Sequence, residues 1–151
     1  MAIKRNDPYG AFNFSVLITP ESGDNIEAGF ADVSGLSNEI TYSEYREGDD
    51  PLNSVRKIPN TYKGGDITLK RGLAGDLALW KWIERTRAGD PKSRATVTVN
   101  LMAEDGSGPV ATWHLDGARP SKWTGPTLAA KGGGEVAMEE LTLVCEDIRF
   151  E

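Results

Sequence analysis

Apolar and polar residues alternate along two pairs of segments, and this period of two is typical of strands with one buried face. The first pair covers residues 12–18 and 26–30, which the turn-forming stretch TPESGDN separates. The second pair covers residues 96–101 and 110–116, with the Gly- and Pro-containing EDGSGP between them. We therefore expect two β-hairpins, one near the start of the chain and one in its C-terminal half.

Two more strands are expected at residues 38–46 and 65–71, and a long polar insertion separates them. A proline-containing loop of this length without regular structure is uncommon in compact domains unless it has a function. Its acidic part precedes a basic part, which favours head-to-tail contact between copies. We expect an arm over residues 44–62. Its candidate contact residues are Glu44, Arg46, Glu47, Asp49, Asp50, Pro51, Val55, Arg56, Lys57 and Ile58.

A long terminal strand is expected over residues 135–150, and its apolar phase shifts twice. One shift falls between Met138 and Leu141, and the other falls between Cys145 and Ile148. Such shifts indicate β-bulges, which bend strands and help sheets to close.

One helix is predicted over residues 76–88, because Leu79, Trp82 and their apolar neighbours gather on one side at the helical angle of about 100° per residue. Asp76 is placed to cap the N-terminus, and Gly89 begins a Gly-Asp-Pro sequence that ends helices. With roughly seven strands, this predicts a mainly β fold, either a small β-barrel or a two-sheet sandwich with one flanking helix.

Length and composition bound the class of protein. The chain has 151 residues and no flexible linker, so we expect residues 1–151 to form a single domain. Its net charge is −6 and it lacks a Lys/Arg cluster, so tight nucleic-acid binding is not expected. No long apolar run and no secretion signal is visible, which predicts a soluble chain without a membrane segment. A single Cys145 excludes an internal disulfide and favours a reducing compartment.

Signals for chemistry are weak throughout the sequence. The one histidine, His114, lies within a predicted strand without a G-x-S-x-G motif, which argues against a nucleophilic triad. Cys145 is in phase with apolar neighbours, which predicts a core residue. The run Gly132–Gly134 lacks the Lys-Ser/Thr of a phosphate loop, and Asp49-Asp50 lacks the ligand spacing of a calcium loop. We therefore expect no catalytic residue, no cofactor and no metal.

Two other classes of function stay open at this point. The four tryptophans are compatible with a monomeric β-barrel that binds a ligand or carbohydrate, although core packing also explains them. A hydrolase would need a pair of carboxylates near a cleft, and nothing in the sequence singles out such a pair.

Six motifs in the chain resemble the tail-tube protein family shared by contractile-tailed phages and extracellular contractile injection systems. They occur in family order over nearly the whole chain, and GGDITLKRG with LWKWI is closest to the injection-system branch. The motifs are DPYGAFNFSV (Asp7–Val16), AGFADVSGL (Ala28–Leu36), EYREGDDPLNSVRKIP (Glu44–Pro59), GGDITLKRGL (Gly64–Leu73), LWKWI (Leu79–Ile83) and RPSKWTGPTLAA (Arg119–Ala130). The terminal EVAMEELTLVCEDI also resembles the closing strand of that family.

The resemblance implies a β-barrel-like subunit with a flanking helix, six copies of which form a ring whose sheets join into a continuous inner barrel. The rings would stack into a hollow inner tube inside a contractile sheath. Baseplate and tube-terminating proteins would be further partners, with protein cargo in the lumen, or DNA in a phage tail. The role would be structural, not enzymatic. Assembly in the bacterial cytoplasm into a phage tail-like particle is also implied.

On this reading, the arm residues named above would reach the adjoining ring. The lumen would be lined by strand faces that carry no basic patch, because such a surface would not retain sliding DNA. The candidate lumen-lining residues are Thr96, Thr98, Asn100, Thr112, His114 and Asp116.

Overall fold

The computed structural model describes residues 7, 9–21, 23, 25–49, 51, 55–73, 75–130, 132 and 136–151. Strands make up 53% of the described residues, so the fold is mainly β. In chain order the elements are β1 (Phe14–Pro20), β2 (Ile26–Ala28), β3 (Asp32–Ser34), β4 (Asn38–Tyr45), β5 (Arg56–Gly64), β6 (Ile67–Gly72), α1 (Ala78–Arg87), the 3-10 helix η1 (Pro91–Ser93), β7 (Ala95–Met102), β8 (Pro109–Thr124), β9 (Met138–Val144) and β10 (Asp147–Phe150).

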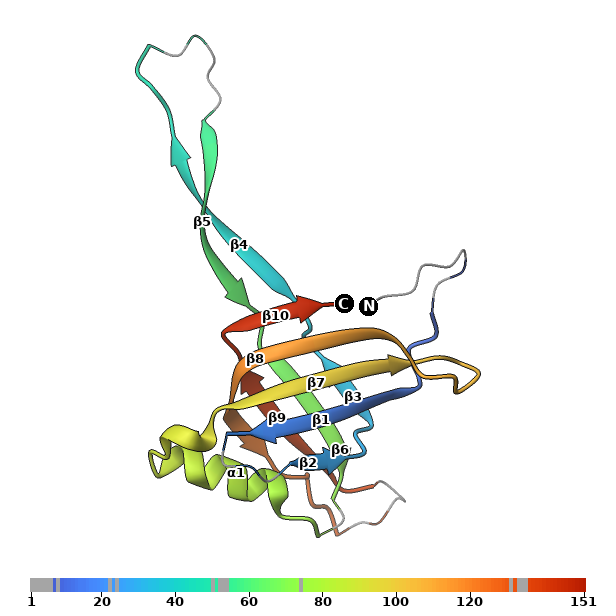
Figure 1. Cartoon of the computed structure of the whole chain (residues 1–151). Coiled ribbons are helices and arrows are strands. Elements are labelled where there is room, and N and C mark those ends of the chain that lie inside the picture. Colours follow the sequence, from blue (N-terminus) through green and yellow to red (C-terminus); the bar gives the residue numbers. More distant parts are fainter. Residues whose placement is uncertain are drawn as a thin grey trace.

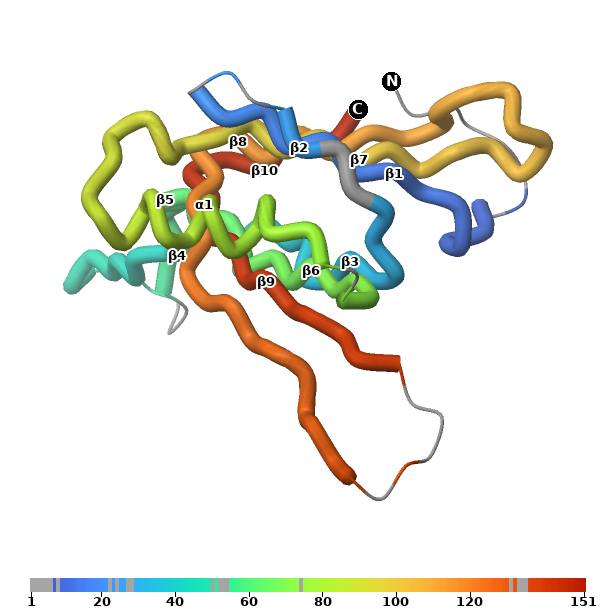
Figure 2. The backbone as a smooth tube through the Cα atoms, turned by 90° about the horizontal axis from the view of Figure 1, so that it is seen from below, coloured from blue at the N-terminus to red at the C-terminus, as the bar shows by residue number. Residues whose placement is uncertain are grey.

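The strands form two layers that share the long strand β8 (Figure 1). The front layer has the order β2-β1-β7-β8-β10, and the back layer has the order β8-β9-β6-β3. Neighbouring strands are antiparallel throughout both layers. The view from below shows the two layers stacked, with the end of β8 and the start of β9 projecting as a ribbon (Figure 2). The hairpin of β4 and β5 forms a separate two-stranded sheet.

The core lies between the layers because each strand turns alternate apolar side chains toward the opposite layer. Helix α1 covers one end of this core with Leu79 and Trp82, both fully buried. The indole Nε1 of Trp82 donates a hydrogen bond to the Ser93 carbonyl at 2.6 Å, which satisfies its polar atom. Each fully buried Leu or Ile stabilises the fold by about 2 kcal/mol. The remaining fully buried large side chains are Ile18, Ile67, Leu69, Val97, Leu115, Leu141 and Leu143.

Strand β8 crosses from the front layer to the back layer at Gly117. Its register with β7 gains one residue between Leu115 and Ala118, which is a β-bulge. Gly117 has φ +65°, and a Cβ there would lie 2.7 Å from Cδ of Glu146. Only glycine therefore fits this corner without strain.

The structure confirms the two predicted hairpins, since β1 pairs with β2 and β7 pairs with β8. It also confirms the helix, and it confirms an interruption of the terminal strand near Cys145, because β9 ends at Val144 and β10 begins at Asp147. The helix starts slightly later than predicted. Asp76 accepts a hydrogen bond from the Ala78 amide at 3.0 Å, but the N-cap position itself is Leu77.

Of the two predicted architectures, the structure matches the two-sheet sandwich with one flanking helix. The layers are not closed into a barrel within one chain, because β2, β3 and β10 each keep an unpaired edge in the described structure. Two other expectations about the fold are wrong. The predicted bulge between Met138 and Leu141 is absent, since β9 pairs with β6 in continuous register there. Glu139, Leu141 and Leu143 alternate on the buried face of β9, and Glu139 is only 2% exposed. The apparent shift in the apolar pattern arose because one of these buried positions carries a charged residue.

The predicted strand over residues 38–46 is confirmed as β4, but the insertion after it has regular structure, contrary to expectation. It belongs to an antiparallel hairpin that begins at Asn38 and ends at Gly64, so the arm is longer than the predicted 44–62. Proline 59 is tolerated because a two-stranded ribbon consists of edge strands. Within the described residues, no helix is long and apolar enough to cross a membrane.

Candidate assembly surfaces

The hairpin of β4 and β5, which we call the arm, twists away from the two layers (Figure 1). Between Glu39 and Lys63 every described residue except the half-buried Thr41 is exposed. A two-stranded ribbon without a covering layer is marginally stable at best. Apolar side chains on such a ribbon are therefore available to another molecule. Its exposed large apolar residues are Ile40, Tyr42, Tyr45, Val55, Ile58 and Tyr62.

The predicted contact residues fall on the outer half of the arm. Glu44 lies opposite Lys57, and Tyr45 lies opposite Arg56. Ile58 follows on β5 opposite Ser43, and it is 48% exposed. Asp50 lies outside the described residues. Exposed positions around the turn are Arg46, Glu47, Asp49, Pro51 and Val55.

The predicted set left out the apolar residues on the inner half of the arm. Ile40 lies directly opposite Tyr62, and Tyr42 lies opposite Pro59. A one-residue bulge in β5 between these pairs is held by Thr41, whose hydroxyl bonds the Thr61 amide and hydroxyl. The signal for the set was present in the sequence as alternation in YSEY and its flanks, but alternation alone does not reveal that neither face is buried.

Glycines allow the root of the arm to approach the body closely. A Cβ at Gly35, where φ is +87°, would lie 2.1 Å from the Asp66 carbonyl oxygen. A Cβ at Gly65 would lie 2.0 Å from the Ser37 hydroxyl, and one at Gly64 would lie 3.2 Å from Sγ of Cys145. The arm is therefore fixed at its base, beside the break between β9 and β10.

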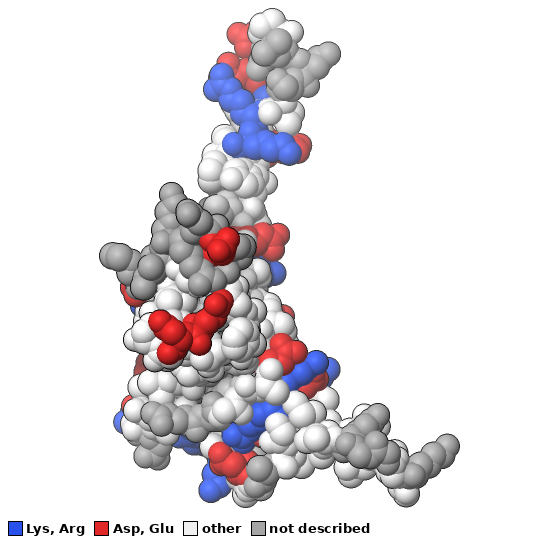
Figure 3. Space-filling model, turned by 90° about the vertical axis from the view of Figure 1, so that its right-hand side faces the viewer, with Lys and Arg blue, Asp and Glu red and all other residues white. Residues whose placement is uncertain are grey.

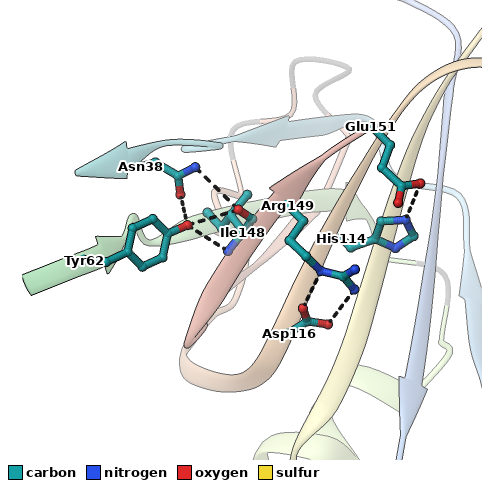
Figure 4. A network of polar contacts seen from close by, with 7 residues as sticks. All are labelled: Asn38, Tyr62, His114, Asp116, Ile148, Arg149 and Glu151. Carbon is teal, nitrogen blue, oxygen red and sulfur yellow. Dashed lines mark hydrogen bonds and ion pairs between the residues drawn. The ribbon is translucent and has the colours of Figure 1, made fainter. Parts of the chain in front are cut away.

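Tyr62 connects the arm to β10 (Figure 4). Its hydroxyl accepts a hydrogen bond from the Ile148 amide at 3.3 Å. The same hydroxyl can donate to Oδ1 of Asn38 at 2.7 Å or to the Ile148 carbonyl at 3.0 Å. Loss of hydration around the hydroxyl raises the pKa of Tyr62, so it keeps its proton at neutral pH.

The six predicted lumen residues gather on one face, the outer face of the front layer. Thr98 lies opposite His114, and Asn100 lies opposite Thr112 with their side chains 2.9 Å apart. None of the six belongs to the buried core. The structure therefore brings the six residues together on one exposed sheet face.

Strand β10 adds charged residues to the same face (Figure 4). Arg149 donates to Asp116 at 2.8 Å and 3.3 Å, and His114 lies 3.3 Å from Glu151. The hydrogen bond and charge of Asp116 raise the pKa of Arg149, so this cation stays charged. Sequence reasoning missed Arg149 because the pairing of β10 beside β8 has no local signal.

Both signs of charge are exposed on the arm (Figure 3). Arg56 and Lys57 lie on β5, and the acidic Glu44, Glu47 and Asp49 lie on β4 and in the turn that follows it. Acidic side chains are visible on the face of the body turned to the viewer. Glu104 and Asp105 are exposed in the turn between β7 and β8. Opposite charges at separate places on one chain can attract when copies meet head to tail.

No arrangement for catalysis appears among these residues. His114 faces a carboxylate and not a nucleophile. Loss of hydration raises the pKa of the Cys145 thiol, which disfavours the reactive thiolate. Among the described residues, no three metal-binding side chains cluster together.

Comparison with known proteins identifies the class. A sequence model of the family described as T4-like virus tail tube protein gp19 matches residues 10–149. No curated protein sequence matches the chain significantly.

Solved structures give the same answer. A chain of the anti-feeding prophage (AFP) baseplate is 26% identical, with a TM-score of 0.84 over 97% of both chains. A chain of the PVC extracellular contractile injection system sheath-tube complex is 26% identical, with a TM-score of 0.81 over 95% of this chain and 91% of that one. Hcp1 from Flavobacterium johnsoniae shares the fold at 15% identity, with a TM-score of 0.54 over 91% and 93%.

These similarities support a structural role and give no support to the ligand-binding alternative. Family membership implies that the chain is not an enzyme. The chain belongs to the T4-like virus tail tube protein gp19 family, and it is a structural subunit of the inner tube of phage tail-like contractile particles.

Proposed function

We propose that six copies of this chain form a ring and that such rings stack into the hollow inner tube. The observation that carries the proposal is an open sandwich with a fully extended arm. Both are incomplete in one chain, since the front layer has unpaired edges and the arm has no body to cover its apolar residues. Joining copies edge to edge removes exposed sheet edges, which otherwise favour aggregation.

In this assembly the arm contacts the adjoining ring. Its outer half carries Arg56 and Lys57, and the described end of the body around the β7–β8 turn carries Glu104 and Asp105. The exposed apolar residues Ile40, Tyr42 and Ile58 would be buried when a neighbouring copy packs on them, and removal of this apolar surface from water favours the contact. All ten predicted contact residues, including Asp50, belong to this proposed contact.

The outer face of the front layer lines the lumen. It is rich in threonine, and its charges near β10 form the pairs Arg149–Asp116 and His114–Glu151. A surface whose charges are neutralised locally attracts neither DNA nor an acidic protein strongly. If each copy gives roughly four strands at about 4.8 Å spacing and about 45° tilt, the backbone circle is about 50 Å across.

The proposed partners follow from the particles to which the similar chains belong. Those particles contain a baseplate, a sheath around the tube and a tube-terminating cap. We assign this chain equivalent sheath, baseplate and terminator partners, with protein cargo in the lumen and DNA if the particle is a phage tail. Each subunit consists of a single domain. Assembly of the subunits takes place in the bacterial cytoplasm.

Negative-stain electron microscopy of the purified chain tests the proposal. Six-membered rings or hollow rods are expected. A single species at the chain mass of 16.4 kDa, at every protein and salt concentration tried, would contradict it.

A further inference from the structure

The hydrogen-bond pattern of β10 defines which of its backbone groups face away from the body. Thr112 and Glu151 exchange two backbone hydrogen bonds, at 3.0 Å and 2.8 Å. Bonding alternates along antiparallel strands, so Arg149 also points its backbone groups toward β8. The N–H and C=O of Ile148 and Phe150 therefore point outward from the edge of the front layer.

One of these two outward positions is already occupied. The Tyr62 hydroxyl accepts from the Ile148 N–H at 3.3 Å and lies 3.0 Å from the Ile148 carbonyl oxygen (Figure 4). Asn38 Nδ2 approaches the same carbonyl at 3.5 Å. Both side chains belong to the arm, so the root of the arm covers the edge at Ile148.

The other outward position is open. Within the described part of the chain, the Phe150 amide and carbonyl have no hydrogen-bond partner, and Phe150 is 60% exposed. Its ring stacks on Trp113 at 5.1 Å between centroids with an interplanar angle of 12°. The end of β10 is thus held in extended form with a free pair of backbone groups.

The opposite edge of the front layer also has an open position. The Met102 amide donates to the Asn13 carbonyl, so odd-numbered residues of β1 point their backbone groups toward β7. Phe14 therefore points away from β7, and it lies beyond the last β2 residue that pairs with β1. A ring of identical copies joins unlike edges, so β10 of one copy meets the β1 edge of the next.

We propose that Tyr62 sets the register in which a second copy of this chain adds its β1 edge to β10. The inference rests on the proposed ring and deepens it. A slip of one residue would turn polar faces toward the core and is excluded by the pattern of the strands. A slip of two residues keeps every face correct, so the pattern cannot prevent it. Tyr62 prevents it by closing Ile148 and leaving Phe150 as the pairing position.

Amide hydrogen exchange on dispersed and assembled protein, separated by sedimentation, tests this proposal in the full chain. In the wild type, the Phe150 amide is expected to slow by at least about tenfold on assembly. The Ile148 amide is expected to be protected in both fractions. In Tyr62→Phe, Ile148 exchange in dispersed protein should rise by at least about tenfold. Its assemblies should contain fewer closed rings. Ser121→Ala is the control, because it removes an exposed hydroxyl that bonds a backbone carbonyl of β9, Thr142, in the back layer and not at β10.

A second pair of variants tests the edge directly. Phe150→Pro removes the outward N–H, whereas Phe150→Ala removes the ring stack and keeps the N–H. Assembly should fail in the proline variant and persist in the alanine variant, with similar unfolding midpoints.

Each adverse result has a distinct meaning. Rods in which Phe150 exchanges at its dispersed rate would show that β10 is not the joint. Tyr62→Phe rods that match those of Ser121→Ala in ring closure and exchange would show that Tyr62 does not set the register. A wild-type chain that never assembles would contradict the proposed tube itself.

Discussion

Arg71 on β6 and Glu139 on β9 form an ion pair inside the protein, with side chains 8% and 3% exposed. Trp123 donates its indole N–H to the second oxygen of Glu139 at 3.1 Å, and Arg71 also bonds the Asp76 carbonyl oxygen at 3.0 Å. The pair thereby links β6, β8 and β9 to the segment that starts α1. A buried pair with its remaining polar atoms satisfied is costly to break from one side.

We expect Glu139→Ala to lower the free energy of unfolding by about 3 kcal/mol, because it removes the buried partner of Arg71 and leaves only the exposed Asp76 to compensate that buried charge. The adjacent pair Lys70–Glu140 is the control, since its side chains are 40% and 35% exposed. Glu140→Ala should cost less than about 1 kcal/mol. Urea unfolding of dispersed subunits measures both values. Equal losses in the two variants would show that burial does not decide the cost.

Asp76 should contribute stability that depends on pH. The Ala78 amide and the Arg71 guanidinium hold the pKa of Asp76 below its ordinary 3.8. A carboxylate with a depressed pKa stabilises the fold above its unfolded pKa and loses that contribution as pH falls through the folded value. Since Asp76 is 56% exposed, the effect should be below about 1 kcal/mol. Unfolding curves of wild type and Asp76→Asn should differ at pH 7 and converge below about pH 3. A gap that stays constant with pH would contradict this.

Gly35 should be required for the root of the arm. Alanine there would combine a φ of +87° with a contact of 2.1 Å to a backbone oxygen. We expect Gly35→Ala to destabilise the chain by at least about 2 kcal/mol, measured by thermal unfolding. Gly48→Ala in the arm turn, where a Cβ meets nothing within 4 Å, should leave the midpoint nearly unchanged.

Reversing the charge of the arm should weaken stacking more than folding. Arg56 and Lys57 are exposed and lie far from the core, so Arg56→Glu with Lys57→Glu should move the unfolding midpoint little. The mass of sedimenting rods should fall by at least about tenfold as contacts between rings become repulsive. Arg87→Glu with Lys92→Glu, at two exposed positions of the body, controls for the same change in net charge. A midpoint that falls in step with rod yield would assign these residues to the fold instead.

The lumen assignment predicts selective access to Thr98. In a Cys145→Ala background, Thr98→Cys within rods should react with a biotin maleimide, which is small enough to diffuse along the tube. Streptavidin should then fail to bind, because sheet closure leaves a passage of only about 40 Å. Thr127→Cys, on an exposed segment after β8, is the comparison position. Capture of intact Thr98→Cys rods by streptavidin would place this face outside the lumen.

Local patterns predicted the elements that depend on local rules. The hairpins of β1 with β2 and β7 with β8 follow from alternation around turn residues, and α1 follows from apolar spacing. The partner of β10 could not be predicted in this way, because a four-residue strand has no sequence signal for which edge it joins. Glu139 misled the interpretation of β9, since a charge is almost never fully buried unless it is paired.

The arm is a second region where local sequence patterns did not fully predict the structure. Its first half was predicted as a strand over residues 38–46, which is confirmed as β4. The insertion that follows contains a proline and many charges and was expected to lack regular structure, yet it includes β5, which pairs with β4. Backbone pairing does not require a buried face. What the residues contact in a neighbouring copy depends on the arrangement of copies, which no local pattern records.

Strand β8 has a mechanical consequence because one continuous backbone runs through both layers. Sliding the layers past each other would have to stretch covalent bonds or unzip two ladders at once, instead of merely separating side chains. A force applied to one layer is therefore transmitted to the other layer through β8. A tube wall built from such subunits should bend as one unit, without slip between its two layers.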